Sequence, residues 1–200
     1  MRHSLQPFTD IGYPVSQFPQ HVTVAEAMAS KLKKLFEGYF KFTIVRNPYD
    51  RLYSGFQQDF YAASQWQQWQ MMKKPIFDRI GENFNRYMQE YVAKANLYDA
   101  WDWVCFFPMS SYSHYEDNYV LDWYGKSENL TEDIDHLSGL LDVNIEKSSD
   151  QNVRVEPSSE LKYIDKYDRA TVALVNQIYA KDFEFFGYEK LNPEDFPEQR

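Results

Sequence analysis

Cysteine is nearly absent from this sequence of 200 residues, because Cys105 stands alone. A single cysteine excludes an intrachain disulfide framework and a zinc site built from several cysteines. No apolar run approaches the roughly 20 residues that a transmembrane helix needs. The first residues, MRHSLQPFTD, also lack the apolar core of a signal peptide. These absences predict a soluble, cytoplasmic protein with no membrane segment in this chain.

Positive charge is scarce as well, since 21 Lys and Arg face 30 Asp and Glu and give a net charge of −9. That balance argues against a general nucleic-acid-binding protein. The deficit is uneven: residues 1–100 carry 12 Lys and Arg against 9 Asp and Glu, whereas residues 101–200 carry 9 against 21. We therefore expect an anionic ligand to bind to the first half of the chain. Residues 190–200 are interpreted as a solvated acidic tail.

Large apolar side chains are abundant, with 15 Phe, 16 Tyr and 5 Trp. A chain of this length can therefore bury a sizeable core. Its length predicts one domain over residues 1–200, and no internal repeat is visible. Residues 1–20 are rich in Pro, Gly, Ser and Gln and are expected to form an irregular lead-in. No cluster with metal-ligand spacing is present, so no metal is expected.

Short apolar runs alternate with amphipathic segments along the chain. The periodicity predicts helices at residues 22–37, 83–97 and 168–183, a helix capped by Thr131, and strands at residues 40–45 and 119–124. The run at 40–45 is nearly continuously apolar, which is typical of a strand buried on both faces of a parallel sheet. This alternation predicts an α/β protein of three layers, α/β/α, with a mostly parallel sheet.

The most informative segment is FKFTIVRNPYDRLYSGF, which predicts a strand, a turn and a helix. Asn47 suits the N-cap of the helix, and Pro48 suits its first position. Arg46 then stands at the carboxyl end of the strand, where open α/β sheets bind ligands, and beside a helix N-terminus that attracts anions. Ser54 is the seventh helical residue and lies roughly 9 Å along the axis from the first, Pro48, so a guanidinium and a hydroxyl could converge on one phosphate. Alternatively, Arg46 pairs with a carboxylate and Ser54 is a small packing residue.

The same segment resembles the 3′-phosphate-binding segment of sulfotransferases that use 3′-phosphoadenosine 5′-phosphosulfate (PAPS). The likeness is to the Golgi carbohydrate and heparan-sulfate 2-O-type group and its bacterial relatives. Their pattern is an apolar strand, then V-R-[ND]-P, then a serine eight residues after the arginine, which Arg46 and Ser54 match. Further stretches resemble those of the family at residues 107–108, 121–130 and 179–188, so the likeness covers most of the chain.

The resemblance implies a P-loop NTPase-like sulfotransferase fold and transfer of a sulfonate group from PAPS to a carbohydrate-type hydroxyl, with no metal. It implies that Arg46 and Ser54 bind the 3′-phosphate. His21, in QHVT, is similar to the histidine of the family's G-H-V-[ST] and would be the base that removes the acceptor proton. The alternative is a loop histidine that caps the following helix or faces solvent.

Three further residues are candidates for the acceptor site or for positioning its loops. His114, in SSYSHYEDNY, could line the acceptor site. Glu128 matches the E-N-L position of the family and is expected to be a buried carboxylate that bonds backbone or basic groups. Lys126 stands where the family usually has arginine, which keeps the charge but loses the bidentate fork.

One family feature has no counterpart here, namely the P-loop-like turn of the form I-P-K-T-G-G-T-S that holds the 5′-phosphosulfate. The first lysine is Lys31, and Gly12 is the only glycine before residue 38. We expect the first βα unit to be missing, by truncation of a longer reading frame or by natural loss, which leaves an exposed sheet edge and little activity in this chain alone.

That departure leaves a second function open. The alternative is a catalytically inactive or truncated module that binds an anionic nucleotide or a sulfated sugar. If a longer, anchored chain exists, the Golgi membrane is the alternative location, as for the Golgi relatives.

Overall fold

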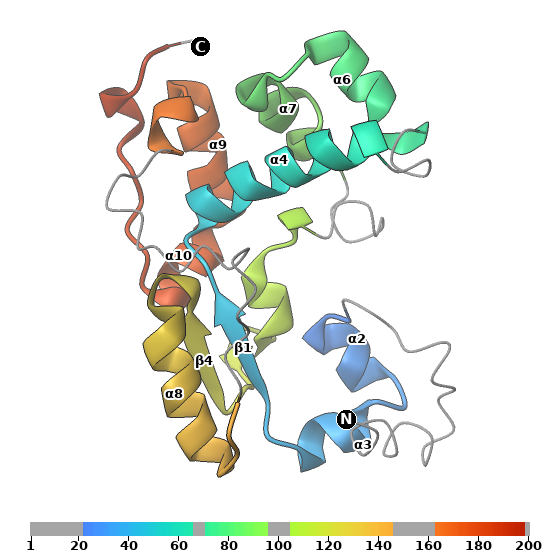
Figure 1. The fold of residues 1–200 in the computed structure, drawn as a ribbon, viewed down its shortest axis with the longest axis vertical. Helices are drawn as coiled ribbons and strands as arrows, with labels where there is room; N and C mark the ends of the chain where they lie inside the picture. The colour runs from blue at the N-terminus through green and yellow to red at the C-terminus, as the bar shows by residue number, and fades with distance from the viewer. Residues whose placement is uncertain (1–21, 66–70, 96–104, 146–162, 199–200) are drawn as a thin grey trace. The chain divides into compact units, whose positions relative to one another are not determined.

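The computed structural model describes residues 22–65, 71–95, 105–145 and 163–198 (Figure 1). The chain divides into two compact units, which are described separately. Unit 1 comprises Met1–Val45 and Met109–Ser127, and unit 2 comprises Arg46–Pro108 and Glu128–Arg200. The proposed base His21 lies outside the described residues.

Unit 1 contains a small parallel sheet. Strand β1 (Phe42–Val45) runs parallel to β4 (Trp123–Lys126), and Figure 1 shows the two side by side. The carboxylate of Asp122 fixes the start of this pair, because it accepts hydrogen bonds from the backbone N–H of Lys41 at 2.7 Å and pairs with its ammonium at 2.7 Å. The described residues thus form an α/β protein with a two-stranded parallel sheet. The larger sheet and its three layers stay a prediction.

The predicted strand at residues 40–45 is shorter than expected and half exposed at its start. Val45 is fully buried, whereas 47% of Phe42 is exposed, so the expectation of burial on both faces is wrong for the first residue of the strand. The predicted strand at residues 119–124 is displaced. An antiparallel hairpin of β2 (His114–Tyr115) and β3 (Asn118–Tyr119) precedes β4. Positive φ angles at Glu116 and Asp117 form its two-residue turn.

The predicted helix at residues 22–37 is two short helices, α2 (Val24–Ala29) and α3 (Lys33–Gly38). The Ser30 hydroxyl donates to the carbonyl of Ala27 at 3.1 Å and accepts from the backbone N–H of Leu32 at 3.1 Å. A serine that bonds nearby backbone groups competes with the helical hydrogen bonds. The break at Ser30 therefore has a local cause.

Unit 2 is mostly helical. Its described elements are α4 (Pro48–Gln65), α6 (Lys74–Ile80), α7 (Phe84–Glu90), α8 (Leu130–Leu141), α9 (Arg169–Ile178), α10 (Ala180–Phe186) and short 3₁₀ turns, among them Val92–Lys94, Ile164–Lys166 and Pro193–Asp195. Aromatic rings make its core: Phe56 of α4 lies 5.4 Å from Phe84 and from Tyr87, and 5.9 Å from Phe77, between ring centroids. Such ring pairs stabilise beyond the area they bury.

Three predicted helices of unit 2 differ from the observed ones at their ends. Helix α8 begins at Leu130, so Thr131 lies within it rather than capping it. The helix predicted over residues 168–183 begins after Asp168, as expected, but breaks at Tyr179. The buried hydroxyl of Tyr179 donates to the carbonyl of Phe106 at 2.7 Å, which is a tertiary contact that periodicity does not reveal. The segment 83–97 is helical only as far as Glu90 before a 3₁₀ turn.

A charged pair is sealed into this core. Lys73 Nζ lies 3.3 Å from Asp59 Oδ2, and the two side chains are 0% and 1% exposed. The Tyr87 hydroxyl donates to the same carboxylate oxygen at 2.5 Å and lies 3.3 Å from Lys73 Nζ. The ammonium and the hydroxyl therefore meet at one carboxylate oxygen, Oδ2 of Asp59, within the aromatic core.

Candidate functional site

The predicted strand–turn–helix unit is confirmed. Arg46 follows β1 directly, and Pro48 is the first residue of α4. The side-chain oxygen of Asn47 accepts a hydrogen bond from the backbone N–H of Tyr49 at 3.0 Å. Its carbonyl accepts from Arg51 at 2.9 Å, which is the first helical bond. Asn47 therefore caps α4 and turns the chain immediately after Arg46.

Arg46 is held by the first turn of α4. Its Nε donates to Asp50 Oδ2 at 2.6 Å, with 38% of the arginine side chain and 28% of the aspartate side chain exposed. The sequence left open that Arg46 pairs with a carboxylate, and the structure shows that this carboxylate is Asp50. Within the described ranges, the two Nη groups of Arg46 have no hydrogen-bond partner. The arginine is thus oriented through one nitrogen, and its outer edge is accessible.

Ser54 lies one helical turn beyond Asp50. Residues four apart on a helix share one side, with Cβ atoms about 5–6 Å apart. Ser54 is half-buried, and its hydroxyl makes no hydrogen bond to the residues that the structure describes. Arg46, Asp50 and Ser54 therefore follow one line along the start of α4.

Glu128 completes the N-terminus of α4. One of its carboxylate oxygens accepts from the backbone N–H of Asn47 at 2.6 Å, and the other accepts from the hydroxyl of Tyr188 at 3.0 Å. The expected bond to backbone is present, but Glu128 is exposed, so the expectation of a buried carboxylate is wrong. Glu128 is exposed because it binds the backbone N–H of Asn47, which lies at the open N-terminal end of α4. Three stretches that carry the resemblance meet here within unit 2.

Arg51, which the sequence reasoning missed, ties α4 to the rest of unit 2. Its Nη1 donates to the carbonyl of Phe107 at 2.6 Å, and its Nη2 lies 3.3 Å from Asp182. In the sequence, Gly55, one helical turn after Arg51, indicates that another segment packs closely against this part of α4. A Cβ there would lie 3.3 Å from Cys105, so the glycine marks where the segment that Arg51 binds approaches α4.

The electrostatics of the site are mixed. Burial, together with the nearby charges of Asp50 and Glu128, raises the pKa of Tyr163 to about 12, although Arg46 acts in the opposite direction. Tyr163 therefore stays a neutral phenol at physiological pH. Of the three charged groups that act on Tyr163, namely Asp50, Glu128 and Arg46, only Arg46 is cationic. Arg46 is therefore the group among them that would attract an anion.

The remaining candidate residues lie in unit 1. His114 is half-buried: its Nδ1 lies 2.7 Å from the Ser113 hydroxyl, and its ring meets the Tyr119 ring edge-on with centroids 5.4 Å apart. Lys126 ends β4, opposite Val45 in the sheet register. Arg46, Ser54 and Glu128 thus belong to unit 2, along the start of α4, whereas His114 and Lys126 belong to the other unit.

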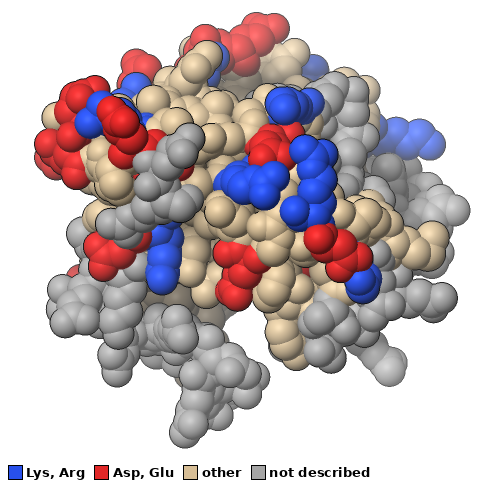
Figure 2. All heavy atoms as spheres, turned by 90° about the horizontal axis from the view of Figure 1, so that it is seen from above, with Lys and Arg blue, Asp and Glu red and all other residues tan. Residues whose placement is uncertain are grey.

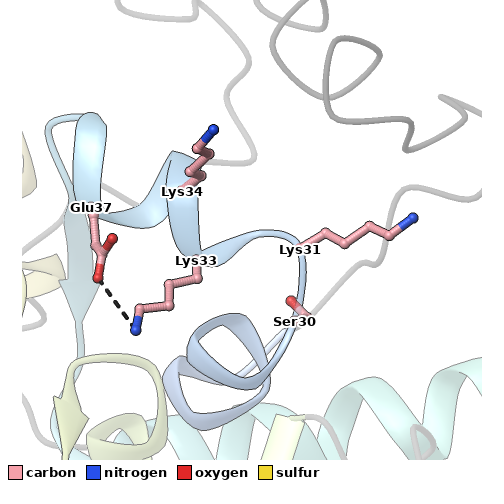
Figure 3. A pocket seen from close by; sticks show the side chains of 5 residues that line it. All are labelled: Ser30, Lys31, Lys33, Lys34 and Glu37. Carbon is pink, nitrogen blue, oxygen red and sulfur yellow. Dashed lines mark ion pairs between the residues drawn. The ribbon is translucent and has the colours of Figure 1, made fainter.

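Unit 1 also contains a shallow hollow of about 390 Å³, lined mostly by lysines, at the bend between α2 and α3. Its lining residues are Ser30, Lys31, Lys33, Lys34 and Glu37. Figure 3 shows the three ammonium groups pointing in different directions, and Lys33 pairs with Glu37 at 3.8 Å. The lysines do not converge, so the hollow is not arranged around a single anion.

On the face drawn in Figure 2, basic and acidic side chains are intermixed. Helices α6 and α7 also pair their charges: Lys74 lies 2.6 Å from Asp78, and Arg79 and Arg86 lie 3.0 Å and 2.7 Å from Glu90. That face therefore offers no broad basic surface. Within the described ranges, no three His, Cys, Asp or Glu residues are grouped to hold a metal ion. No helix in these ranges combines the length and apolarity needed to cross a membrane.

A strand followed directly by an arginine, a helix capped by the next residue and a serine eight positions after the arginine define an α/β protein with a strand–turn–helix unit. A model of the Sulfotransferase family matches residues 15–189. The chain therefore belongs to this family, whose members are PAPS-dependent transferases. It is also similar to an uncharacterized protein of Archaeoglobus fulgidus, at 32% identity over 130 residues, which is 61% of this chain and 88% of the relative. No solved structure matches the chain.

Proposed function

We propose that this protein transfers a sulfonate group from PAPS to a hydroxyl of a carbohydrate-type acceptor, on the P-loop-like fold that the family implies. The observation that carries the proposal is the orientation of Arg46. Its guanidinium is fixed through Nε by Asp50 at 2.6 Å, at the N-terminus of α4, while its outer edge stays accessible. A planar guanidinium edge is well suited to two hydrogen bonds to one phosphate.

In this proposal Arg46 and Ser54 hold the 3′-phosphate of the donor. Arg46 supplies the charged fork, Ser54 supplies a neutral hydroxyl donor, and the helix N-terminus adds its dipole. Glu128 positions the turn, because it binds the backbone N–H of Asn47 at 2.6 Å. The nucleotide is thereby held by one end, which leaves the 5′-phosphosulfate to meet the acceptor.

The transfer itself is an in-line displacement at sulfur. The acceptor oxygen forms a new S–O bond, while the bond between sulfur and the 5′-phosphate oxygen breaks and 3′-phosphoadenosine 5′-phosphate leaves. The hydroxyl proton passes to a base, for which His21 is the candidate. His114 and Lys126 are proposed for the acceptor side, where an imidazole and an ammonium suit a polar or anionic sugar.

A second candidate function rests on a sequence observation. Before residue 38 the chain has one glycine, Gly12, and its first lysine is Lys31, so no Gly-rich loop with a lysine is available there for the 5′-phosphosulfate. A module that binds the nucleotide or a sulfated sugar without catalysis fits that composition. Acceptor-dependent formation of 3′-phosphoadenosine 5′-phosphate from PAPS distinguishes the two functions, because only the transferase releases it.

The 3′-phosphate site is tested by calorimetric titration with 3′-phosphoadenosine 5′-phosphate and, for comparison, 5′-AMP. The wild-type chain is expected to prefer the bisphosphate at least tenfold, which corresponds to about 1.4 kcal/mol. Arg46→Ala is expected to lose that preference and Ser54→Ala to reduce it. Arg79→Ala is the matched control, since Arg79 is also an exposed, ion-paired arginine of unit 2. A preference unchanged in Arg46→Ala contradicts the proposal.

A further inference from the structure

We infer that Asp50 is a positioning residue for the ligand phosphate, because it holds the Arg46 guanidinium in the orientation that binds the anion. This inference rests on the proposed function, since it takes Arg46 as the ligand of the 3′-phosphate. Asp50 itself would not touch the nucleotide.

The hydrogen-bonding pattern of Arg46 carries the inference. A guanidinium has five N–H donors in one plane, one on Nε and two on each Nη. Asp50 engages Nε at 2.6 Å, and within the described part of the chain neither Nη has a partner. The two donors that form the fork across the Nη groups thereby point away from the carboxylate.

The support behind Asp50 is rigid. Asp50 lies at the third position of an 18-residue helix. The preceding residue, Tyr49, is 1% exposed, its carbonyl accepts from the buried Tyr167 hydroxyl at 2.7 Å, and its own hydroxyl accepts from the backbone N–H of Leu191 at 2.9 Å. The first turn of α4 is thus anchored from two sides. A carboxylate on such a base can restrict the long side chain of Arg46, which otherwise loses its rotamer freedom only when the ligand binds.

Asp50 also has an opposite effect on an anionic ligand. Its negative charge lies beside the phosphate that Arg46 would hold, and Glu128 adds a second carboxylate at the same helix end. Tyr163, whose pKa both carboxylates raise, is a neutral phenol. Orientation by Asp50 therefore strengthens phosphate binding, whereas repulsion by Asp50 weakens it. The two effects have opposite signs, so one substitution decides which of them dominates.

The experiment measures how many times more tightly 3′-phosphoadenosine 5′-phosphate binds than 5′-AMP, which isolates the contribution of the 3′-phosphate. In Asp50→Ala this ratio is expected to fall by about threefold to tenfold, the effect of losing one ordered long side chain. Asp50→Asn keeps an oxygen that accepts from Nε but loses the charge, and it is expected to restore most of the ratio. Asp78→Ala is the matched control, because it breaks an i,i+4 pair of 2.6 Å on α6 of the same unit.

The outcomes separate this inference from the proposed function. If wild-type protein shows no preference for the bisphosphate, the proposed 3′-phosphate site fails and the inference fails with it. If the preference exists and Arg46→Ala removes it, but Asp50→Ala keeps or raises it, only the role of Asp50 is overturned. Should Asp50→Ala not fold, Asp50→Ser takes its place, because serine is well tolerated near a helix start yet its hydroxyl is one bond too short to reach Nε.

Discussion

Removing the carboxylate of Asp59 is expected to destabilise unit 2 severely. Asp59 and Lys73 are 1% and 0% exposed, with 3.3 Å between Oδ2 and Nζ. At an effective dielectric constant of 20, two unit charges at that distance attract by about 5 kcal/mol. The attraction offsets the desolvation of both ions, so the pair adds little net stability while intact. Asp59→Ala removes the attraction and leaves the Lys73 ammonium buried without the charge of Asp59.

The expected loss is about 3–5 kcal/mol in the free energy of unfolding, the range for breaking a buried ion pair by removing one partner. The hydroxyl of Tyr87 adds to the loss, because it donates to the Asp59 carboxylate at 2.5 Å and its acceptor disappears. A domain has only about 5–15 kcal/mol of stability in total. Asp59→Ala should therefore unfold a substantial part of the protein at mild urea concentrations.

The assay is equilibrium unfolding in urea at 25 °C, followed by far-ultraviolet circular dichroism. The exposed pair of Lys74 and Asp78, at 2.6 Å, provides the comparison. Asp78→Ala is expected to change the unfolding free energy by less than about 1 kcal/mol. The double variant Asp59→Leu with Lys73→Met should recover most of the stability, because it removes both charges. An Asp59→Ala protein as stable as Asp78→Ala would refute the reasoning, since Lys73 would then not be charged and buried.

Three further predictions concern the surroundings of the site. Arg51→Met is expected to lower the unfolding free energy by about 3–5 kcal/mol in the same urea assay, because it leaves the buried Asp182 without its counter-charge. Arg51→Lys should lose less. Glu128→Ala is expected to lower the free energy of unfolding by about 1 kcal/mol, because it removes the acceptor for the Asn47 N–H. A loss of less than a few tenths of a kcal/mol would show that solvent replaces the carboxylate. Burial raises the pKa of Tyr163 from the ordinary tyrosine value of about 10 to about 12. The folded state thus holds the phenol proton more tightly than the unfolded state, so the free energy of unfolding should fall as pH rises from about 10 to 12. In thermal melts, Tyr163→Phe should reduce this pH dependence, and an unchanged pH dependence would contradict the prediction.

The start of α4 was predictable because its signals are local. Asn47 and Pro48 are adjacent residues with strong preferences for the cap and the first helical position. Asp50, the partner of Arg46, lies only four residues away, and the sequence left a carboxylate partner open as an alternative. Ser30, by contrast, broke a helix whose apolar spacing was correct, because its hydroxyl bonds the backbone. Periodicity alone cannot weigh such a side-chain bond.

The parts of the site that the sequence did not reveal depend on contacts between distant residues. Arg51 pairs with Asp182, which lies 131 residues further along the chain. Glu128 was selected through a resemblance, but its exposed position follows from the open helix end that it caps. Tyr179, where a predicted helix is interrupted, bonds through its hydroxyl to Phe106, 73 residues away. No window of neighbouring residues contains this information.

The cap on α4 has a consequence for the order of events during synthesis. The backbone N–H of Asn47 donates to the carboxylate of Glu128, 81 residues later, and Glu128 accepts in turn from the hydroxyl of Tyr188, a further 60 residues along. Chains emerge from the ribosome from the N-terminus, at about 5–20 residues per second. Arg46 and Ser54 therefore leave the ribosome well before the residues that complete their helix start. The proposed phosphate site is therefore complete only after Tyr188 has been made.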